Sequence, residues 1–508
     1  MNLSIIDILS FILFIVFVIG ISIYASRKEE TSEDYFLAGR NLTWWLIGFS
    51  LIASNISTEH FVGMAGRGYE LGLAIASYEW MAAITLVIVA FLFLPKFLKS
   101  GIYTIPEYLE YRYNRTARSI MAFFMMIAYI FVALASVLYS GALALKSIFD
   151  INLVFGVWLI AILAGAYTIY GGLKAVVWSD LIQGIALLLG GILITIIGFV
   201  KIGGINKFLE LGGDKLHTVL PWNHPEMPWI AVFIGGLWIP NLFYWGLNQF
   251  ITQRTLGARS LKEGQKGIIL AAFIKLIIPI IIVFPGIMAY ELFANSIPQA
   301  DQAYPIMIQK ILPAGLKGIM FAALFGAVMS SLDSMLNSAS TIFTIDIYKK
   351  FINKTADNKK MVKIGRISTA VFVIIGGFWA PTIASFGSVF KYIQMIWGFI
   401  SPGIVASFLF GIVVKKAPPI ASIGSMILGI PVYGACLYFM PETAFLHHMA
   451  ITFIILIIYM SIVTYLFPLK ELKVLPVNDK INLETSSSIK IGGILVIIST
   501  MILYILFW

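Results

Sequence analysis

The chain of 508 residues is 60% hydrophobic and only 12% charged, whereas soluble domains carry about 25% charged residues. This composition excludes a soluble globular protein. The formal net charge of +10 comes from lysine and arginine residues that gather in alternate segments between apolar stretches, a pattern of membrane topology that argues against nucleic-acid binding.

Fourteen apolar stretches are each long enough to cross a bilayer, for which about 20 residues suffice. In chain order they cover residues 4–25, 43–69, 73–96, 116–148, 152–170, 177–202, 228–252, 264–291, 315–348, 365–385, 388–413, 417–439, 446–468 and 489–507. The first lacks a basic leading segment and a small-residue cleavage site, so we interpret it as a retained helix. The sequence therefore predicts an all-α polytopic membrane protein with 14 transmembrane helices.

Basic residues predict the orientation of these helices. The connections richest in Lys and Arg follow the first, third, seventh, ninth, eleventh and thirteenth stretches. Arg254 and Arg259 belong to the connection after the seventh stretch. The positive-inside rule places such connections in the cytoplasm. We therefore expect a protein of the cell (inner) membrane with both termini outside.

Two stretches contain residues that interrupt a helix. Residues 54–58 read SNIST, and residues 235–250 read GGLWIPNLFYWGLNQF. Ser, Asn and Thr side chains compete for backbone hydrogen bonds, while Gly and Pro weaken or remove helical ones. Irregular backbone at membrane depth is tolerated only against protein or a water-filled cavity, where freed carbonyls can bind a small cation. Both stretches are therefore predicted to be broken helices.

The spacing of the broken stretches predicts an internal repeat. Stretches two to six and seven to eleven each hold five crossings and begin with a broken helix, and an odd number of crossings inverts the second set. The predicted organisation is a first helix and cytoplasmic loop (1–42), a first five-helix repeat (43–202), a second, inverted repeat (203–413) and three peripheral helices (414–508).

Ionisable side chains inside apolar stretches indicate a hydrated path. Burial in a bilayer is costly for such groups, so they are rare in membrane helices and often functional. This chain has six of them: Glu59, His60, Glu79, Asp180, Lys275 and Asp333. A single such side chain is as often a structural group that pairs with a neighbouring helix as a functional one. Six of them, with both signs of charge, favour a transporter with a site midway through the membrane.

Several segments resemble the sodium/solute symporter family, in particular its sodium/glucose cotransporter branch and the bacterial galactose-transporting members. They are SEDYFLAGR (32–40), SNISTEHFVGMAGRGYELGLAIASYEW (54–80), GIYTIPEYLEYRYN (101–114), YGGLKAVVWSDLIQG (170–184), NLFYWGLNQFITQRT (241–255), AAFIKLIIP (271–279) and SSLDSMLNSASTIFTIDIY (330–348). The likeness extends from about residue 30 to residue 410. It implies a secondary active symporter in which inward sodium flow drives uptake of a neutral sugar or polyol by alternating access. An enzyme is not implied.

The resemblance also implies which residues bind the cargo. The sugar site would comprise Asn55, His60, Glu79, Asn241, Lys275 and Gln394. Tyr244 would close the inner gate with Trp245 beside it, although such residues also form aromatic girdles at membrane interfaces. Groups that donate and accept hydrogen bonds would match the sugar hydroxyls, and an aromatic plane would cover an apolar face of the ring.

Sodium is the one implied coupling ion, and no further cofactor is expected. The resemblance implies a sodium site formed by carbonyls of Ala53, Ile56 and Ala327 and hydroxyls of Ser330 and Ser331. The alternative for the two serines is small-residue helix packing, which the resemblance disfavours.

A second cation site is predicted between Asp180 and Asp333, with Ser330 and Ser334 on the same helix face as Asp333. Two carboxylates near one cation would bind it strongly, while without one they would repel. The ion would be a second sodium or a proton. The alternative is that Asp333 pairs with a lysine or arginine, or with water.

Departures from the galactose-transporting members leave the cargo open. His60, Ala82 and Ala133 differ from the residues of those members, so other hexoses and inositol are equally compatible with the pattern. An amino acid, a vitamin or sialic acid on the same scaffold is an alternative. An intramembrane enzyme is disfavoured because H-E-x-x-H and G-x-S-x-G motifs are absent from the sequence, and a single cysteine, Cys436, excludes a dithiol centre.

Overall fold

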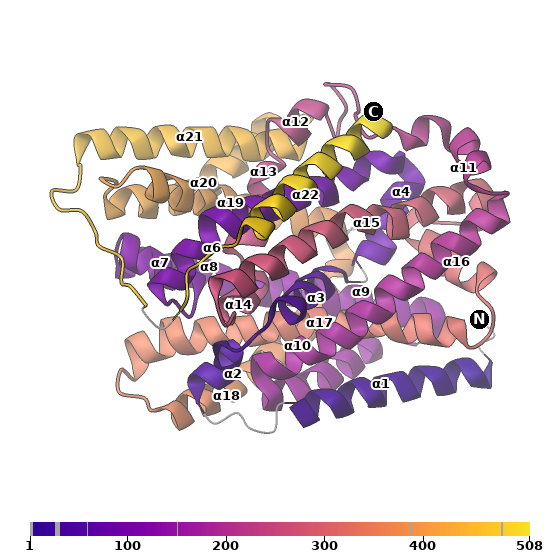
Figure 1. Cartoon of the computed structure of the whole chain (residues 1–508), viewed down its shortest axis with the longest axis horizontal. Helices are drawn as coiled ribbons and strands as arrows, with labels where there is room; N and C mark the ends of the chain where they lie inside the picture. The colour runs from indigo at the N-terminus through magenta and orange to yellow at the C-terminus, as the bar shows by residue number, and fades with distance from the viewer. Residues whose placement is uncertain (1–3, 26–30, 58, 150, 387–388, 479–480) are drawn as a thin grey trace.

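The computed structural model describes residues 4–25, 31–57, 59–149, 151–386, 389–478 and 481–508, and these ranges contain helices but no β-strand (Figure 1). The first part of the chain forms α1 (Ile5–Ala25), α2 (Ser32–Leu37), α3 (Trp44–Asn55), α4 (Ala65–Leu71), α5 (Ser77–Ile88), α6 (Leu94–Ser100), α7 (Ile105–Arg112), α8 (Arg115–Ile127), α9 (Ala135–Phe149), α10 (Leu153–Ile202) and α11 (Ile205–Gly212).

The second part forms α12 (Trp229–Phe233), α13 (Trp238–Leu242), α14 (Gln249–Leu256), α15 (Leu261–Phe293), α16 (Ala303–Ile311), α17 (Leu316–Ile342), α18 (Asn358–Trp379), α19 (Val389–Val413), α20 (Pro419–Phe439), α21 (Phe445–Leu466) and α22 (Ser487–Leu506). Wider, π-helical segments adjoin several of them: η2 (Glu59–Met64), η4 (Val89–Phe93), η5 (Ala128–Leu134), η7 (Phe243–Leu247) and η10 (Phe343–Ile352).

Eleven helices in the described residues are long and apolar enough to cross a bilayer. The polytopic all-helical prediction is thereby confirmed, and the count of fourteen remains a prediction. The difference lies in stretches 4–25 and 152–170, where the described apolar helices are shorter, and in 43–69 and 73–96, where one helical run covers His60–Ser100.

The run His60–Ser100 reverses its direction near Gly72. This residue has φ +82°, and a Cβ there would overlap the backbone of Lys215, so glycine alone fits the turn. The contacts with α15 show this reversal. Before Gly72 they advance along α15, from Asn55 with Lys275 to Ala65 with Gly286. After Gly72 they run back, from Trp80 with Leu276 to Ala90 with Gln265. The two predicted stretches thus form separate arms on one face of α15.

The 50-residue helix α10 joins two further stretches that were predicted as separate helices. Its two arms run in opposite directions along α17. On the first arm, Ile160 lies near Val328 and Thr168 contacts Asp333, so the contacts advance along α17. On the second arm, Asp180 contacts Ser330, Gln183 contacts Gly326 and Gly190 contacts Met320, so they run back along it. The chain therefore folds back between two arms, and the apolar helices described there are Leu153–Ala166 and Leu173–Ile202.

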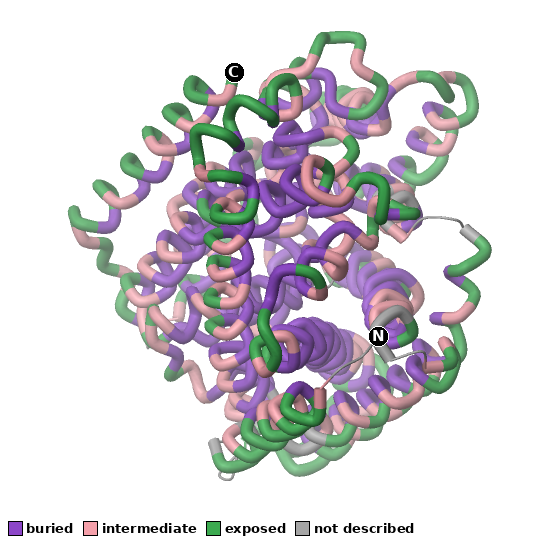
Figure 2. The backbone as a smooth tube through the Cα atoms, turned by 90° about the vertical axis from the view of Figure 1, so that its right-hand side faces the viewer, coloured by how far each residue is buried: buried purple, intermediate pink, exposed green. Residues whose placement is uncertain are grey.

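Burial places α17 at the centre of the bundle, since every residue from Met320 to Ile342 is buried. Figure 2 shows the buried backbone gathered in the interior and the exposed backbone on outer helices and loops. Large apolar side chains nevertheless face outward on peripheral helices, as with Leu13, Phe378 and Tyr465. An outer surface of this kind suits hydrocarbon rather than water.

Close packing of α15 against α4 supplies a test of this arrangement. A Cβ at Gly286 would overlap the carbonyl oxygen of Ala65. We expect Gly286→Ala to lower the free energy of unfolding by about 1–3 kcal/mol, because overpacking forces the two helices apart. Thermal unfolding in detergent micelles measures this change. In the control Gly434→Ala, the new methyl meets only an atom of the Phe399 ring at 3.4 Å, and an equal loss there would contradict the close approach.

Candidate substrate and cation sites

The second stretch is broken where the sequence predicts it. Helix α3 ends at Asn55, Ile56 has extended backbone (φ −78°, ψ 97°), and helical structure resumes at Glu59 in η2. The Ser and Asn side chains of this segment explain the break, since they offer the backbone alternative hydrogen bonds. The interruption releases carbonyls of the last turn of α3 from helical bonding.

The seventh stretch is broken twice. Helix α12 ends at Phe233, the backbone turns at Gly235 and Gly236, and α13 begins at Trp238. This break was predicted from the glycines. The second break, at Asn248 between η7 and α14, was not predicted (φ −84°, ψ 118°).

Contacts with distant parts of the chain fix both breaks in the seventh stretch. A Cβ at Gly236 would overlap the carbonyl oxygen of Leu446 in α21, so backbone meets backbone there. At the second break, Asn248 accepts a hydrogen bond from the hydroxyl of Tyr129. Gly246 and Asn248, which are two residues apart, are the signal in the sequence that would have indicated this second break.

A buried polar cluster lies beside the first break. The ammonium of Lys275, on α15, contacts both the carboxylate of Glu79 on α5 and the side-chain oxygen of Asn55. His60 Nε2 lies 3.4 Å from Glu79 Oε1. Four of the predicted cargo residues therefore meet in one network. Opposite charges offset the cost of burying Lys275, which is 0% exposed.

The two predicted gate residues adjoin this cluster. Asn55 Nδ2 donates to the Tyr244 hydroxyl at 3.0 Å, and the Lys275 ammonium lies 4.9 Å from the centroid of a Trp245 ring. The rings of Tyr244 and Trp245 are 5.2 Å apart. Trp245 is buried and Tyr244 half-buried, so these aromatic residues belong to the interior of the bundle and not to an interfacial girdle.

Two predicted cargo residues remain to be placed. Asn241 is buried one turn before Tyr244, and its side-chain nitrogen has no hydrogen-bond partner among the described residues. His60 Nδ1 also has none within that part of the chain. The backbone of Gln394 lies in α19, but its side chain is outside the described residues.

The predicted sodium ligands are distributed over α3 and α17. Ser330 Oγ lies 3.3 Å from the Ala53 carbonyl oxygen, and Ser331 Oγ donates to the Ser54 carbonyl at 3.3 Å. Ala327 lies one turn earlier on α17 and is buried, as is Ile56. The structure thus brings the serine pair to the carbonyls freed at the first break. Ser54 was not among the predicted ligands.

Asp180 is the centre of a second, fully buried network. Its carboxylate lies 3.0 Å from Arg254 Nη2 and accepts hydrogen bonds from Ser50 and Ser330 at 2.5 Å each and from Ser54 at 2.9 Å. Both charged residues are 0% exposed. The cation that the structure places at Asp180 is therefore a guanidinium.

The burial of Arg254 corrects its assignment to a basic cytoplasmic connection. The residue lies on α14, which extends the seventh stretch inward, and it also contacts the hydroxyl of Ser334 and donates from Nε to Ser50 at 2.7 Å. The polar sequence ITQRT, uninterrupted by Gly or Pro, was the signal that the helix continues. Counting charges by connection could not distinguish this arginine from Arg259, which is exposed.

Asp333 has a different neighbour. The hydroxyl of Thr168 on α10 donates to Asp333 Oδ1 at 2.5 Å, and Asp333 is 0% exposed. Of the four residues predicted for a second cation site, Asp180, Ser330 and Ser334 share the network of Arg254. Asp333 instead accepts its hydrogen bond from Thr168, on the first arm of α10, whereas Asp180 lies on the second arm.

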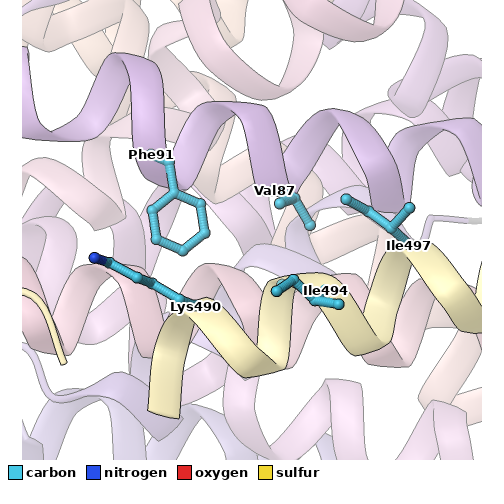
Figure 3. Close-up of a pocket in the computed structure, with 6 residues that line it drawn as sticks. Val87, Phe91, Lys490, Ile494 and Ile497 are labelled. Atoms are coloured by element: carbon cyan, nitrogen blue, oxygen red, sulfur yellow. The ribbon is translucent and has the colours of Figure 1, made fainter. Parts of the chain in front are cut away.

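A shallow hollow on the lipid-facing side, between α5 and α22, is of another kind (Figure 3). Val87, Phe91, Ile494 and Ile497 line it, and Lys490 lies at one end. Because its walls are almost entirely apolar, it offers a polyol no convergent set of hydrogen bonds.

Comparison with known proteins gives concordant matches. The profile of the Sodium:solute symporter family matches residues 35–429. A sodium/glucose cotransporter of Vibrio parahaemolyticus is 43% identical, covering 100% of this chain and 99% of that protein. Sodium/glucose cotransporter 1 of Ovis aries is 32% identical over 83% of this chain and 70% of its own length. The solved substrate-bound, outward-open structure of a Na+-coupled sialic acid symporter superposes with a TM-score of 0.84 at 26% identity, covering 93% of this chain and 100% of that one.

Proposed function

Since this chain belongs to the sodium:solute symporter family and is a sodium-coupled membrane transporter, we propose that it takes up a neutral hexose or related polyol by alternating access. The observation that carries this proposal is the cluster of Asn55, His60, Glu79 and Lys275 against Tyr244 and Trp245. The kinship with sodium/glucose cotransporters supports it.

The chemistry of the cluster suits a polyhydroxylated neutral molecule. Carboxylate and amide oxygens accept hydrogen bonds from sugar hydroxyls, while ammonium, imidazole and amide nitrogens donate to them. The buried nitrogen atoms of Asn241 and His60 that lack protein partners would be satisfied by cargo hydroxyls. We also assign Gln394 to this site, as the resemblance implies.

A different solute on the same scaffold is the second candidate, because the structural relative with the high TM-score is a sialic acid symporter. An anionic cargo needs a cation that the protein does not already neutralise. In the described cluster the ammonium of Lys275 is paired with Glu79, whose carboxylate would repel an anion. The geometry therefore favours a neutral cargo.

We assign sodium to the oxygens of Ala53, Ile56, Ala327, Ser330 and Ser331. Sodium that must be released again is best held by neutral oxygens, and the serine hydroxyls already reach the carbonyls freed at the first break. The ion would bind between hydroxyl and carbonyl, replacing these long contacts. Binding would thereby couple α3, which carries Asn55, to α17.

We propose one sodium per cargo molecule, with Arg254 supplying the positive charge at Asp180. A second cation between Asp180 and Asp333 would have to displace this guanidinium or share its carboxylate. A tenfold sodium gradient supplies about 1.4 kcal/mol and 100 mV about 2.3 kcal/mol per charge, so one ion sustains a cargo ratio of several hundred. Two net charges per cargo molecule in a transport assay would establish the second site instead.

The proposed topology has fourteen crossings in a 5+5 inverted-repeat core, both termini outside and residues 1–42, 43–202, 203–413 and 414–508 as its parts. Figure 1 supports it: the first turn of α1 and the last turn of α22 lie at the same end of the bundle, and α2 and α7 lie toward the other end. We also propose the cell membrane as its location, which the kinship with the sodium/glucose cotransporter of Vibrio parahaemolyticus supports.

Uptake into proteoliposomes tests the function. Labelled glucose, galactose, myo-inositol and sialic acid are offered with and without an inward sodium gradient. We expect accumulation of at least one neutral polyol, and only with the gradient. Hexose uptake indifferent to sodium would refute the coupling, and accumulation of sialic acid alone would refute the neutral cargo.

The serine pair supplies a prediction about sodium. We expect Ser330→Ala and Ser331→Ala each to raise the sodium concentration for half-maximal uptake at least about tenfold, because each removes one ligand, worth about 1.4 kcal/mol of binding free energy. Saturating sodium should restore most of the maximal rate. The control is Ser340→Ala on the same helix, whose hydroxyl bonds, within the described part of the chain, to the Asn337 carbonyl alone. Unchanged sodium dependence in both variants would exclude the assigned site.

A further inference from the structure

A basic cavity lies at the end of the bundle that carries α7, remote in sequence from the transport cluster. Its volume is about 510 Å³, and it is bounded by α7, the start of α8, η10 and the segment that leads to α18. Five cationic side chains line it: Arg115, Arg118, Lys349, Lys350 and Lys354. We call it the basic cavity.

Three carboxylates lie against two of these five cations, Arg118 and Lys350, so the whole group keeps a net charge of +2. Arg118 Nε lies 2.5 Å from Asp346, Arg118 Nη1 lies 2.6 Å from Glu110, and Lys350 Nζ lies 2.8 Å from Glu110. Glu107 is 3.8 Å from Arg118. Burial alone would raise the pKa of Glu110, but hydrogen bonds from Lys350 and Arg118 hold that pKa below its ordinary value, so this carboxylate stays charged.

The other three cations keep an unbalanced charge. Lys349, Lys354 and Arg115 have no carboxylate partner among the described residues, and all three are exposed at the wall of the cavity. Arg115 donates from Nη2 to the carbonyl oxygen of Lys350, which directs its guanidinium along the same wall. An anion entering the basic cavity would therefore meet positive charge that the protein has not already compensated.

Two apolar side chains beside the lining of the basic cavity face outward, and we call them its apolar rim. Phe351 and Ile352, at the end of η10, are 54% and 64% exposed. The guanidinium of Arg115 lies 4.3 Å from the centroid of the Phe351 ring, so the apolar and cationic groups are contiguous. Large exposed apolar side chains at the end of a membrane-spanning helix are expected at the level where acyl chains meet headgroups.

We propose that the basic cavity binds the phosphate headgroup of an anionic phospholipid, with its acyl chains against Phe351 and Ile352. Basic pockets between transmembrane helices on the cytoplasmic side are suited to such headgroups. The apolar rim favours a lipid over a free phosphate, because only a lipid has acyl chains that can pack against Phe351 and Ile352. The lipid would brace the pair Arg118 and Asp346, which joins α8 to the continuation of α17.

Lipid retention by the purified full-length protein tests the proposal. Wild type, Lys349→Ala/Lys354→Ala and Lys359→Ala/Lys360→Ala are compared in micelles containing phosphatidylglycerol or phosphatidylcholine, and bound lipid is counted by native mass spectrometry. The second double variant has the same net charge, but its substituted lysines lie on the first turn of α18, outside the lining of the basic cavity.

We expect phosphatidylglycerol to bind wild type and the α18 control equally, and the cavity variant about thirtyfold more weakly, as the loss of two basic contacts implies. Equal losses in both variants would show a diffuse charge effect and overturn the proposal. Equal retention of the two lipids would overturn it as well. Inorganic phosphate is the third probe, and displacement of the lipid by phosphate at equal affinity would assign the cavity to a soluble anion.

Discussion

Sodium-driven uptake is expected to fall to background in Glu79→Gln, while the protein still reaches the membrane. The Glu79 carboxylate contacts both the Lys275 ammonium and the His60 ring. A glutamine keeps the shape but leaves a buried ammonium without its counter-charge, a change that typically costs about 3–5 kcal/mol. Uptake of the labelled sugar accepted by wild type is the measurement, with the amount of folded protein measured by size-exclusion chromatography.

A double variant separates loss of the site from loss of the fold. Glu79→Gln/Lys275→Met removes both charges, so it should recover much of the stability while transport stays absent. Thr85→Ala is the control on the same helix, since among the residues that the structure describes the Thr85 hydroxyl bonds to the Met81 carbonyl alone. Transport by Glu79→Gln with an unchanged KM for the sugar would show that the cluster does not bind cargo.

Arg254→Ala is expected to destabilise the protein by about 3–5 kcal/mol and to abolish transport, because the Asp180 carboxylate loses its cation in a fully buried place. The measurement is thermal unfolding over a range of sodium concentrations. We expect sodium to stabilise this variant more than it stabilises wild type, since the vacated carboxylate becomes a cation ligand and bound ligand raises stability.

The matched control for this prediction is Arg259→Ala. Arg259 is exposed, and its guanidinium is 3.9 Å from Glu263, so its removal should change the free energy of unfolding by less than about 1 kcal/mol. If sodium stabilised Arg254→Ala and wild type to the same extent, the guanidinium would not occupy a cation position. The one-ion proposal would then lose its structural reason.

The sequence was sufficient for features that depend on local chemistry. Ser54, Asn55 and Ser57 predicted the first break because their side chains compete with helical hydrogen bonds, and α3 ends there. Glu79 and Lys275 were identified because a bilayer makes isolated charges costly, and the structure pairs them. The family resemblance added the assignment of roles, which geometry alone does not test.

Other features depended on the position of distant helices. At the second break of the seventh stretch, Gly246 and Asn248 are a local signal, but the contact with Tyr129 that fixes Asn248 is not visible in the sequence. Arg254 was indistinguishable from a loop arginine until α14 carried it to Asp180. Of the two antiparallel arms of α10, the described residues make only Leu173–Ile202 long enough to count as a membrane span, so a count of apolar stretches and a count of spans differ.

The contact between Gly236 and Leu446 has a consequence for the C-terminal helices. At this point α21 abuts the turn that precedes α13, and the two backbones touch without side chains between them. Because no side chain separates them that could change its rotamer, we expect α13 to be unable to move toward α21 without displacing it. The helix α21 would then take part in any movement of the seventh stretch during transport.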